Sequence, residues 1–142
     1  MGTRSVTYIH DGDRDSGVIC AIYRQMDGYP TAMGADIADA LGSKTVVNGI
    51  GMNSANVVNG MGCAAAQLVA ALKDGAGSIY MAEPSSSGEE YNYHVFFDGD
   101  RLNPKPDAAL SVDVLARGDS IWTGLLRDFD GEEIESRQNE DD

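Results

Sequence analysis

The chain has few cysteines, few basic residues and no long apolar segment. Its 142 residues include two cysteines, too few for a disulfide framework, and we interpret Cys20 and Cys63 as inert core residues. No apolar stretch reaches the roughly 20 residues that a membrane-spanning helix needs. Residues 1–5 (MGTRS) are not followed by the apolar segment of a secretory signal. We therefore expect a protein that stays in a cytoplasm, without membrane contact.

The shortage of basic residues limits the partners. Ten Lys and Arg residues face 23 Asp and Glu residues, which gives a net charge of −13. Nucleic-acid polymers are bound largely by Lys and Arg that neutralise phosphates, so this charge opposes binding of DNA or RNA. A small nucleotide stays compatible, because a few local arginines can outweigh a distant negative field.

Complete catalytic and metal-binding motifs are also lacking, so the sequence predicts no enzyme, no cofactor and no metal site. The segment Asp11, Asp13 and Asp15 alternates like the start of a calcium loop, but Ser16 and Ile22 occupy the positions that need glycine and an acid. We interpret it as an acidic hairpin turn, with a weak cation site as the alternative. No G-x-S-x-G, H-E-x-x-H or P-loop motif is present.

Both histidines, His10 and His94, fall in predicted strands and lack metal-ligand spacing, so we interpret them as structural strand residues. The carboxylates are numerous, but the sequence does not pair any two of them for acid–base chemistry.

What the sequence does contain predicts an α+β fold: a small antiparallel, meander-like sheet packed by two helices at about 31–41 and 62–73. Met33, Ile37 and Leu41 repeat at helical spacing and should form one buried face. Strand-like segments at both ends of the chain flank the two helices. Residues 1–126 are predicted to form one globular domain. The final sixteen residues, 127–142, hold eight acids and are predicted to be a disordered tail.

The Val-Val-Asn-Gly tetrapeptide occurs twice, at 46–49 and 57–60, and the second copy leads into the predicted helix. Residues 60–65 (GMGCAA) fit the G-x-G-x-x-A form of a dinucleotide fingerprint, and a helix N-terminus attracts anions. The preceding strand is very short and the upstream chain lacks the βα units of a doubly wound sheet. We therefore interpret the glycines as a sharp backbone turn that leads into a buried helix. Contact of this helix start with an anionic ligand is the alternative.

The turn at residues 23–30 (YRQMDGYP) is the most informative segment. It concentrates an arginine, a glutamine and two tyrosines in a chain that is short of basic groups. Arginine can clamp a phosphate, tyrosine can stack on a base, and glutamine can read a base edge. The alternative is a purely structural turn in which Arg24 pairs with a neighbouring acid.

Three blocks together resemble a family of short proteins encoded by tailed phages: the N-terminal MGTRS, the YRQxDGYP turn and the segment NGMGCxAxQ at 59–67. The resemblance covers about residues 1–97. Members of this family are mostly uncharacterised, so the resemblance implies a phage origin and no activity.

From these observations we expect a phage-encoded protein that sequesters a small nucleotide signal of host antiphage defence, a cyclic oligonucleotide or an ADP-ribose-like molecule. It should act as a homo-oligomer in the host cytoplasm. A virion-associated or capsid-decorating protein is the alternative, and a small hydrolase is a third possibility. The expected ligand contacts are Arg4, Tyr23, Arg24, Gln25, Asp27, Tyr29, Asn59 and Gly60.

Overall fold

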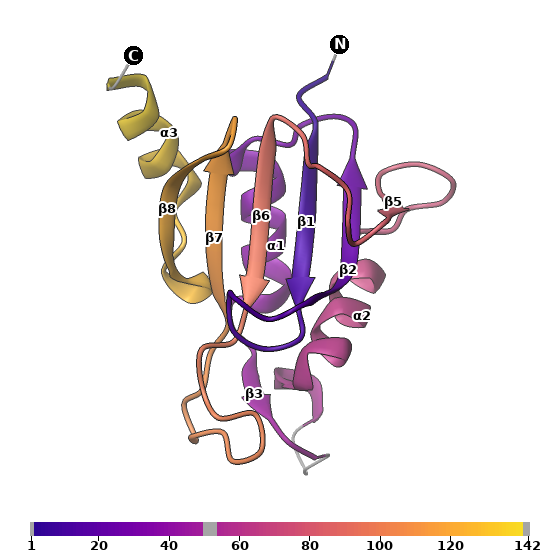
Figure 1. Cartoon of the computed structure of the whole chain (residues 1–142), viewed down its shortest axis with the longest axis vertical. Helices are drawn as coiled ribbons and strands as arrows, with labels where there is room; N and C mark the ends of the chain where they lie inside the picture. The colour runs from indigo at the N-terminus through magenta and orange to yellow at the C-terminus, as the bar shows by residue number, and fades with distance from the viewer. Residues whose placement is uncertain (1, 50–53, 141–142) are drawn as a thin grey trace.

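A computed structural model describes residues 2–49 and 54–140 of the chain. An α-helix follows each of three groups of strands: the N-terminal hairpin, the pair of short strands after it, and the last four strands (Figure 1). In chain order the elements are β1 (Ser5–His10), β2 (Val18–Arg24), a π-helical turn (Pro30–Gly34), α1 (Ala35–Leu41), β3 (Thr45–Val47), a 3₁₀ turn (Ser54–Asn56), β4 (Val57–Asn59), α2 (Gly60–Leu72), β5 (Tyr80–Ala82), β6 (Tyr91–Phe96), β7 (Ser111–Ala116), β8 (Asp119–Leu125), a second 3₁₀ turn (Leu126–Asp128) and α3 (Gly131–Glu140).

The larger sheet has six strands in the order β5-β2-β1-β6-β7-β8. All neighbouring pairs are antiparallel except the central pair, β1 and β6, which is parallel. The sheet therefore joins an N-terminal hairpin, extended by β5, to a three-stranded meander, β6–β8. The predicted α+β class is confirmed, while the parallel pair is a feature that a simple meander does not have.

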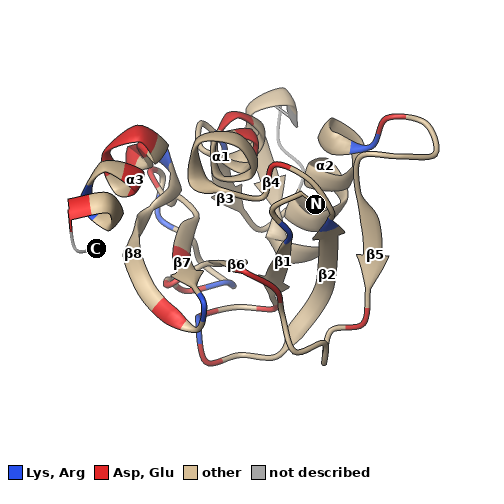
Figure 2. Ribbon diagram, turned by 90° about the horizontal axis from the view of Figure 1, so that it is seen from above, with Lys and Arg blue, Asp and Glu red and all other residues tan. Residues whose placement is uncertain are grey.

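Helices α1 and α2 pack on one face of this sheet. Figure 2, in which the strands are seen from above, shows both helices on the same side of the curved sheet. Both predicted helices are present: the segment 31–41 forms the π-helical turn Pro30–Gly34 followed by α1, and the segment 62–73 corresponds to α2, which begins two residues earlier and ends one residue earlier. Met33, Ile37 and Leu41 are all 0% exposed, as their spacing predicts. Ile9, Ile22, Tyr93, Val95, Val112 and Val114 meet them from the sheet. Among the described helices, none has the length and apolar character needed to cross a bilayer.

The two Val-Val-Asn-Gly segments pair with each other. β3 and β4 form a separate parallel two-stranded sheet in which Val46 lies opposite Val58. The carboxamide Oδ1 of Asn59 accepts a hydrogen bond of 2.7 Å from the backbone N–H of Gly49, which links the ends of the two strands. Val46 and Val58 are both buried in the main core, so the repeated segment serves packing.

The prediction of a disordered tail is wrong for residues 127–140, which form a 3₁₀ turn and α3; residues 141 and 142 lie outside the described part. Ile134 is buried at 4% exposure, and Phe129 packs edge-on against Trp122 with ring centroids 5.7 Å apart. At Gly131 an added Cβ would lie 2.6 Å from the carbonyl oxygen of Pro30, so the two backbones are in close contact. These few contacts hold the C-terminal segment on the rest of the domain, although its acidic composition predicted disorder.

Candidate functional site

Three of the predicted contacts, Arg24, Gln25 and Asp27, line one cavity of about 540 Å³, which we call the turn cavity. Its other walls come from α1, from the C-terminal end of α2 and from the segment that leads into β5. The turn cavity is therefore built where the hairpin end meets both helices. The residues that complete its lining are Met26, Asp36, Ala71, Leu72, Asp74, Ser78, Ile79 and Tyr80.

The sequence left two alternatives for Arg24, a ligand contact or an ion pair with a neighbouring acid. In the structure Arg24 lines this cavity and also forms an ion pair. Its Nη1 lies 2.6 Å from Oδ2 of Asp36 and 3.3 Å from the sulfur of Met33. Its Nε donates a 2.9 Å hydrogen bond to the carbonyl oxygen of Met26. These contacts orient the guanidinium and leave Nη2 without a hydrogen-bond partner in the described chain.

The charge of the turn cavity is negative. One arginine faces three aspartates, Asp27, Asp36 and Asp74, so the lining residues sum to −2 (+1 from arginine, −3 from aspartate). The C-terminal end of α2, which carries the negative end of the helix dipole, also borders it. A ligand with several phosphate charges is therefore disfavoured here, whereas a neutral or singly charged group is accommodated.

Tyr80 is the residue of this site that the sequence did not single out. Its side chain is 47% exposed, and its ring lies 6.4 Å from the ring of Tyr23 and 5.1 Å from Nζ of Lys73. Tyr80 and Tyr23 are directly opposite in the β2–β5 pairing. Tyr23 therefore supports the aromatic ring at the rim, on the sheet face away from the helices. Only strand pairing reveals this, because β5 lies far along the chain from the hairpin.

Asn59 and Gly60 lie apart from the turn cavity. They occupy the start of α2, whereas Leu72, at its end, lines that cavity. The helix has 13 residues. At about 1.5 Å per residue its two ends are roughly 18 Å apart. Gly60 lines a separate cavity of about 250 Å³ and has φ +82°, the conformation of a tight helix entry. One mononucleotide would not reach both groups.

Arg4 and Tyr29 are near the turn but outside its cavity. Arg4 is exposed just before β1. The Tyr29 hydroxyl donates a 3.2 Å hydrogen bond to Asp27, and the charge of that carboxylate together with this bond raises the pKa of Tyr29. The intervening Gly28 is structural: its carbonyl accepts a buried 2.7 Å hydrogen bond from Tyr93, and an added Cβ would lie 2.8 Å from that of Ser5.

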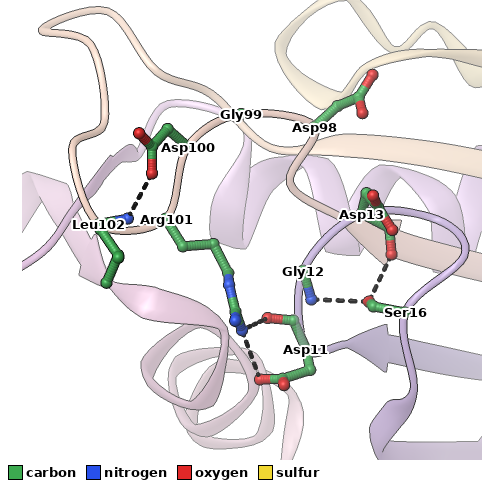
Figure 3. Close-up of a pocket in the computed structure, with 9 residues that line it drawn as sticks. All are labelled: Asp11, Gly12, Asp13, Ser16, Asp98, Gly99, Asp100, Arg101 and Leu102. Carbon is green, nitrogen blue, oxygen red and sulfur yellow. Dashed lines mark hydrogen bonds and ion pairs between the residues drawn. The ribbon is translucent and has the colours of Figure 1, made fainter.

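A second cavity, of about 570 Å³, is lined by four aspartates from two loops (Figure 3). Arg101 neutralises Asp11 with Nη1 3.2 Å from Oδ1, and Asp100 accepts a 2.9 Å hydrogen bond from the backbone N–H of Leu102. Across residues 2–49 and 54–140, no three His, Cys, Asp or Glu side chains are grouped as a metal site requires. The acidic hairpin turn is therefore held by its own hydrogen bonds and by Arg101.

The two histidines, interpreted from sequence as structural strand residues, contact each other on the face of the sheet away from α1 and α2, which we call the open face. Nε2 of His10 lies 2.8 Å from Nδ1 of His94, and the ring of His94 stacks on Tyr8 at 4.7 Å. Burial, followed by the charges of Arg14 and His10, lowers the pKa of His94 to about 4 against the opposing effect of Asp113. The ring of His94 is therefore uncharged at neutral pH.

Asp113 lies directly across the β6–β7 pair from His94. Burial alone would raise its pKa, but hydrogen bonds from Ser120, Thr123 and Arg14 and the charge of Arg14 together lower it. The oxygen Oδ1 accepts bonds of 2.7 and 2.9 Å from the two hydroxyls, and Oδ2 lies 3.0 Å from Nε of Arg14. The open face thus carries an ordered polar cluster in which the aspartate is ionised.

Comparisons with known proteins add no assignment. No family model matches the chain, and neither curated proteins nor solved structures gave a significant match.

Proposed function

We propose that the protein is a phage-encoded binding protein that sequesters a small nucleotide signal of host antiphage defence. The observation that carries the proposal is the turn cavity, whose lining includes Arg24, Gln25 and the half-exposed Tyr80 at its rim. Its volume of about 540 Å³ is within the range of small-molecule sites, roughly 300–1,000 Å³. It combines a cation, an amide and an aromatic ring, the three groups that recognise nucleotides.

Each of these groups has bonding capacity left for a ligand. Arg24 has a free Nη2, and Gln25 is exposed and its side chain makes no hydrogen bond within the described residues. Tyr80 offers a ring on which a base can stack, a contact worth about 1–3 kcal/mol per base. The proposed mode of binding places one phosphate oxygen on Arg24 and a base edge on Gln25, with the ring of Tyr80 at the rim of the cavity.

The charge of the cavity defines which nucleotides fit it best. Because its lining sums to −2, each additional phosphate charge weakens binding. A cyclic oligonucleotide carries one charge per phosphate, whereas the triphosphate of ATP concentrates several charges on one group. The proposal therefore favours cyclic nucleotides and ADP-ribose-like molecules over ATP.

The same proposal includes a homo-oligomer in the host cytoplasm. Met26 and Tyr80 line the turn cavity at 62% and 47% exposure, and Met81, which follows Tyr80 on β5, is 60% exposed. A second copy that covered this rim would bury these side chains and exclude water from a bound nucleotide. The oligomer is therefore proposed to close the site, and its mass in solution should not change when Arg24 is replaced.

Thermal unfolding of the purified protein with cyclic di- and trinucleotides, cyclic ADP-ribose isomers, NAD and ATP tests the proposal. A ligand at 100 times its dissociation constant adds about 2.7 kcal/mol, which shifts the melting temperature by several degrees for a domain of this size. We expect the shift with a cyclic nucleotide, its loss in Arg24→Ala and its reduction in Gln25→Ala. Arg137→Ala, which removes an ion-paired arginine from α3, is the matched control and should respond like the unchanged protein.

Absence of a shift with every compound would contradict the proposal. The virion-associated role would then be tested by mass spectrometry of purified particles, where the protein should be present in a constant copy number. A shift with ATP that exceeds every cyclic nucleotide would contradict the charge argument while leaving a nucleotide-binding role in place.

A further inference from the structure

The hydrogen bonds of the two histidines determine where their protons lie. Nδ1 of His10 is 2.9 Å from the carbonyl oxygen of Ser16, which can only accept, so this nitrogen carries a proton. When both rings are neutral, Nε2 of His10 is then an acceptor. Because Nδ1 of His94 lies 2.8 Å from it, that nitrogen must be the donor. The remaining nitrogen, Nε2 of His94, consequently carries a lone pair.

This lone pair has no partner in the described part of the chain. Nε2 of His94 makes no hydrogen bond, and it is not one of the fully buried unpaired polar atoms, so it reaches solvent. Stacking on Tyr8, whose hydroxyl donates a 2.9 Å bond to the carbonyl oxygen of Ser86, fixes the plane of the ring. The chain therefore presents a rigid, uncharged acceptor at the surface, between the loops that contain Ser16 and Ser86.

A cation lies beside this acceptor. Arg14 is held through Nε on Asp113, the residue directly across the strand pair from His94. Its two Nη groups make no hydrogen bond within residues 2–49 and 54–140, and the side chain is 38% exposed. Asp113 is bonded by Arg14 through Nε alone, so the Nη groups remain available for an external acceptor.

We propose that His94 and Arg14 form a binding subsite on the open face for an oxyanion that carries its own O–H group, such as a protonated phosphate. The oxyanion accepts hydrogen bonds from the Nη groups of Arg14, and its O–H donates to Nε2 of His94. The subsite is independent of the turn cavity and shares none of its lining residues. The groups that surround it are Tyr8, His10 and Asp113, together with the Ser120 and Thr123 hydroxyls.

Inorganic phosphate and sulfate distinguish this subsite from simple anion attraction. Both are tetrahedral oxyanions, but at about pH 8, well above the unperturbed imidazole pKa of about 6.5, phosphate carries an O–H and sulfate carries none. The unprotonated Nε2 therefore pairs with phosphate, whereas it repels an oxygen of sulfate. We expect phosphate to bind about tenfold more tightly, the effect of one hydrogen bond to a charged partner.

The measurement is a long-range ¹H–¹⁵N NMR titration of the histidine rings at this pH. Before ligand is added, the ring of His94 should show the neutral Nδ1–H tautomer, and phosphate should shift its Nε2. Arg14→Gln should abolish the response to phosphate, while Arg137→Gln, on α3, should leave it unchanged.

Three results would overturn the proposal. They are an Nε2–H tautomer for His94, equal affinities for phosphate and sulfate, and an unchanged phosphate response in Arg14→Gln. The tautomer and the anion ratio are read on the unmodified protein, so they remain decisive if the variant folds poorly. Neither result depends on the nucleotide titration of the turn cavity, so the two proposals fail separately.

Discussion

The two faces of the six-stranded sheet use the same strands for different purposes. Ile9 and His10 are neighbours on β1 and are almost equally buried, at 0% and 3% exposure. Ile9 belongs to the core beneath the helices, whereas His10 belongs to the polar cluster on the open face. Successive side chains on a strand point to opposite faces, so two neighbouring residues can belong to the apolar core and to the polar cluster respectively.

Burial by itself therefore does not identify the core of this protein. The helix-covered face is apolar and owes its burial to α1 and α2. The open face is covered at points by loops, because His10 is bonded to Ser16 and Tyr8 to Ser86, and it mixes a small apolar cluster with charged and hydroxyl groups. A face covered by short loops keeps groups such as Nε2 of His94 within reach of solvent.

The largest expected effect comes from the helix-covered face. Ile22→Ala removes a side chain with 0% exposure from the main core and should lower the free energy of unfolding by about 3 kcal/mol. Ile19→Ala, on the same strand but 43% exposed, is the matched control and should cost less than about 1 kcal/mol. Urea denaturation measures both. Equal decreases in the free energy of unfolding would contradict the assignment of Ile22 to the core and of Ile19 to the surface.

The next effect belongs to the open face and depends on pH. The pKa of His94 is lowered to about 4, so between this value and an unfolded value of about 6.5 the unfolded chain binds a proton that the folded protein does not. Stability should therefore be complete above about pH 6.5 and fall as the pH drops toward 4, by about 2 kcal/mol after allowance for solvent screening.

Denaturation midpoints measured across that pH range test this prediction, and His94→Gln should flatten the profile. An unchanged slope in this variant would assign the pH dependence to other groups. Ile22→Ala should lower the whole profile without changing its slope, since it removes no titratable group.

A smaller effect is expected at Asp113, which neighbours the core residue Val114 on β7. Asp113→Ala removes the acceptor of Arg14, Ser120 and Thr123 and should cost about 1–2 kcal/mol, because these donors can turn to solvent. Urea denaturation above pH 7 is the measurement. A loss as large as that of Ile22→Ala would mean that the open face contributes to stability as much as the core does.

The site at residues 23–30 was predicted from the sequence in part. The prediction identified Arg24, Gln25 and Asp27, which line one cavity in the structure. It did not identify Tyr80, since no local pattern links β5 to that turn, and it grouped Asn59 and Gly60 with residues at the far end of α2. Functional groups that lie close in the chain were predictable, whereas groups brought together by packing were not.

The prediction of a disordered C-terminal tail was wrong because it used composition alone and not the contacts of individual residues. Eight acids in sixteen residues predict a solvated tail. Packing of Phe129 on Trp122 and burial of Ile134 are enough to anchor α3 against the π-helical turn and the sheet edge. A helix that is polar on most of its surface needs only a narrow apolar stripe, and an average over the segment conceals it.

The sequence by itself determined the α+β class, the positions of α1 and α2 and the buried stripe of Met33, Ile37 and Leu41, because these features follow from local periodicity. Only the tertiary structure decided that β1 and β6 pair in parallel, which places Tyr8 opposite His94 and brings His10 into contact with it. The two histidines are 84 residues apart in the chain. A parallel pair requires a long crossover, and its partners are selected by how the intervening helices pack on the sheet rather than by any pattern in the strands themselves.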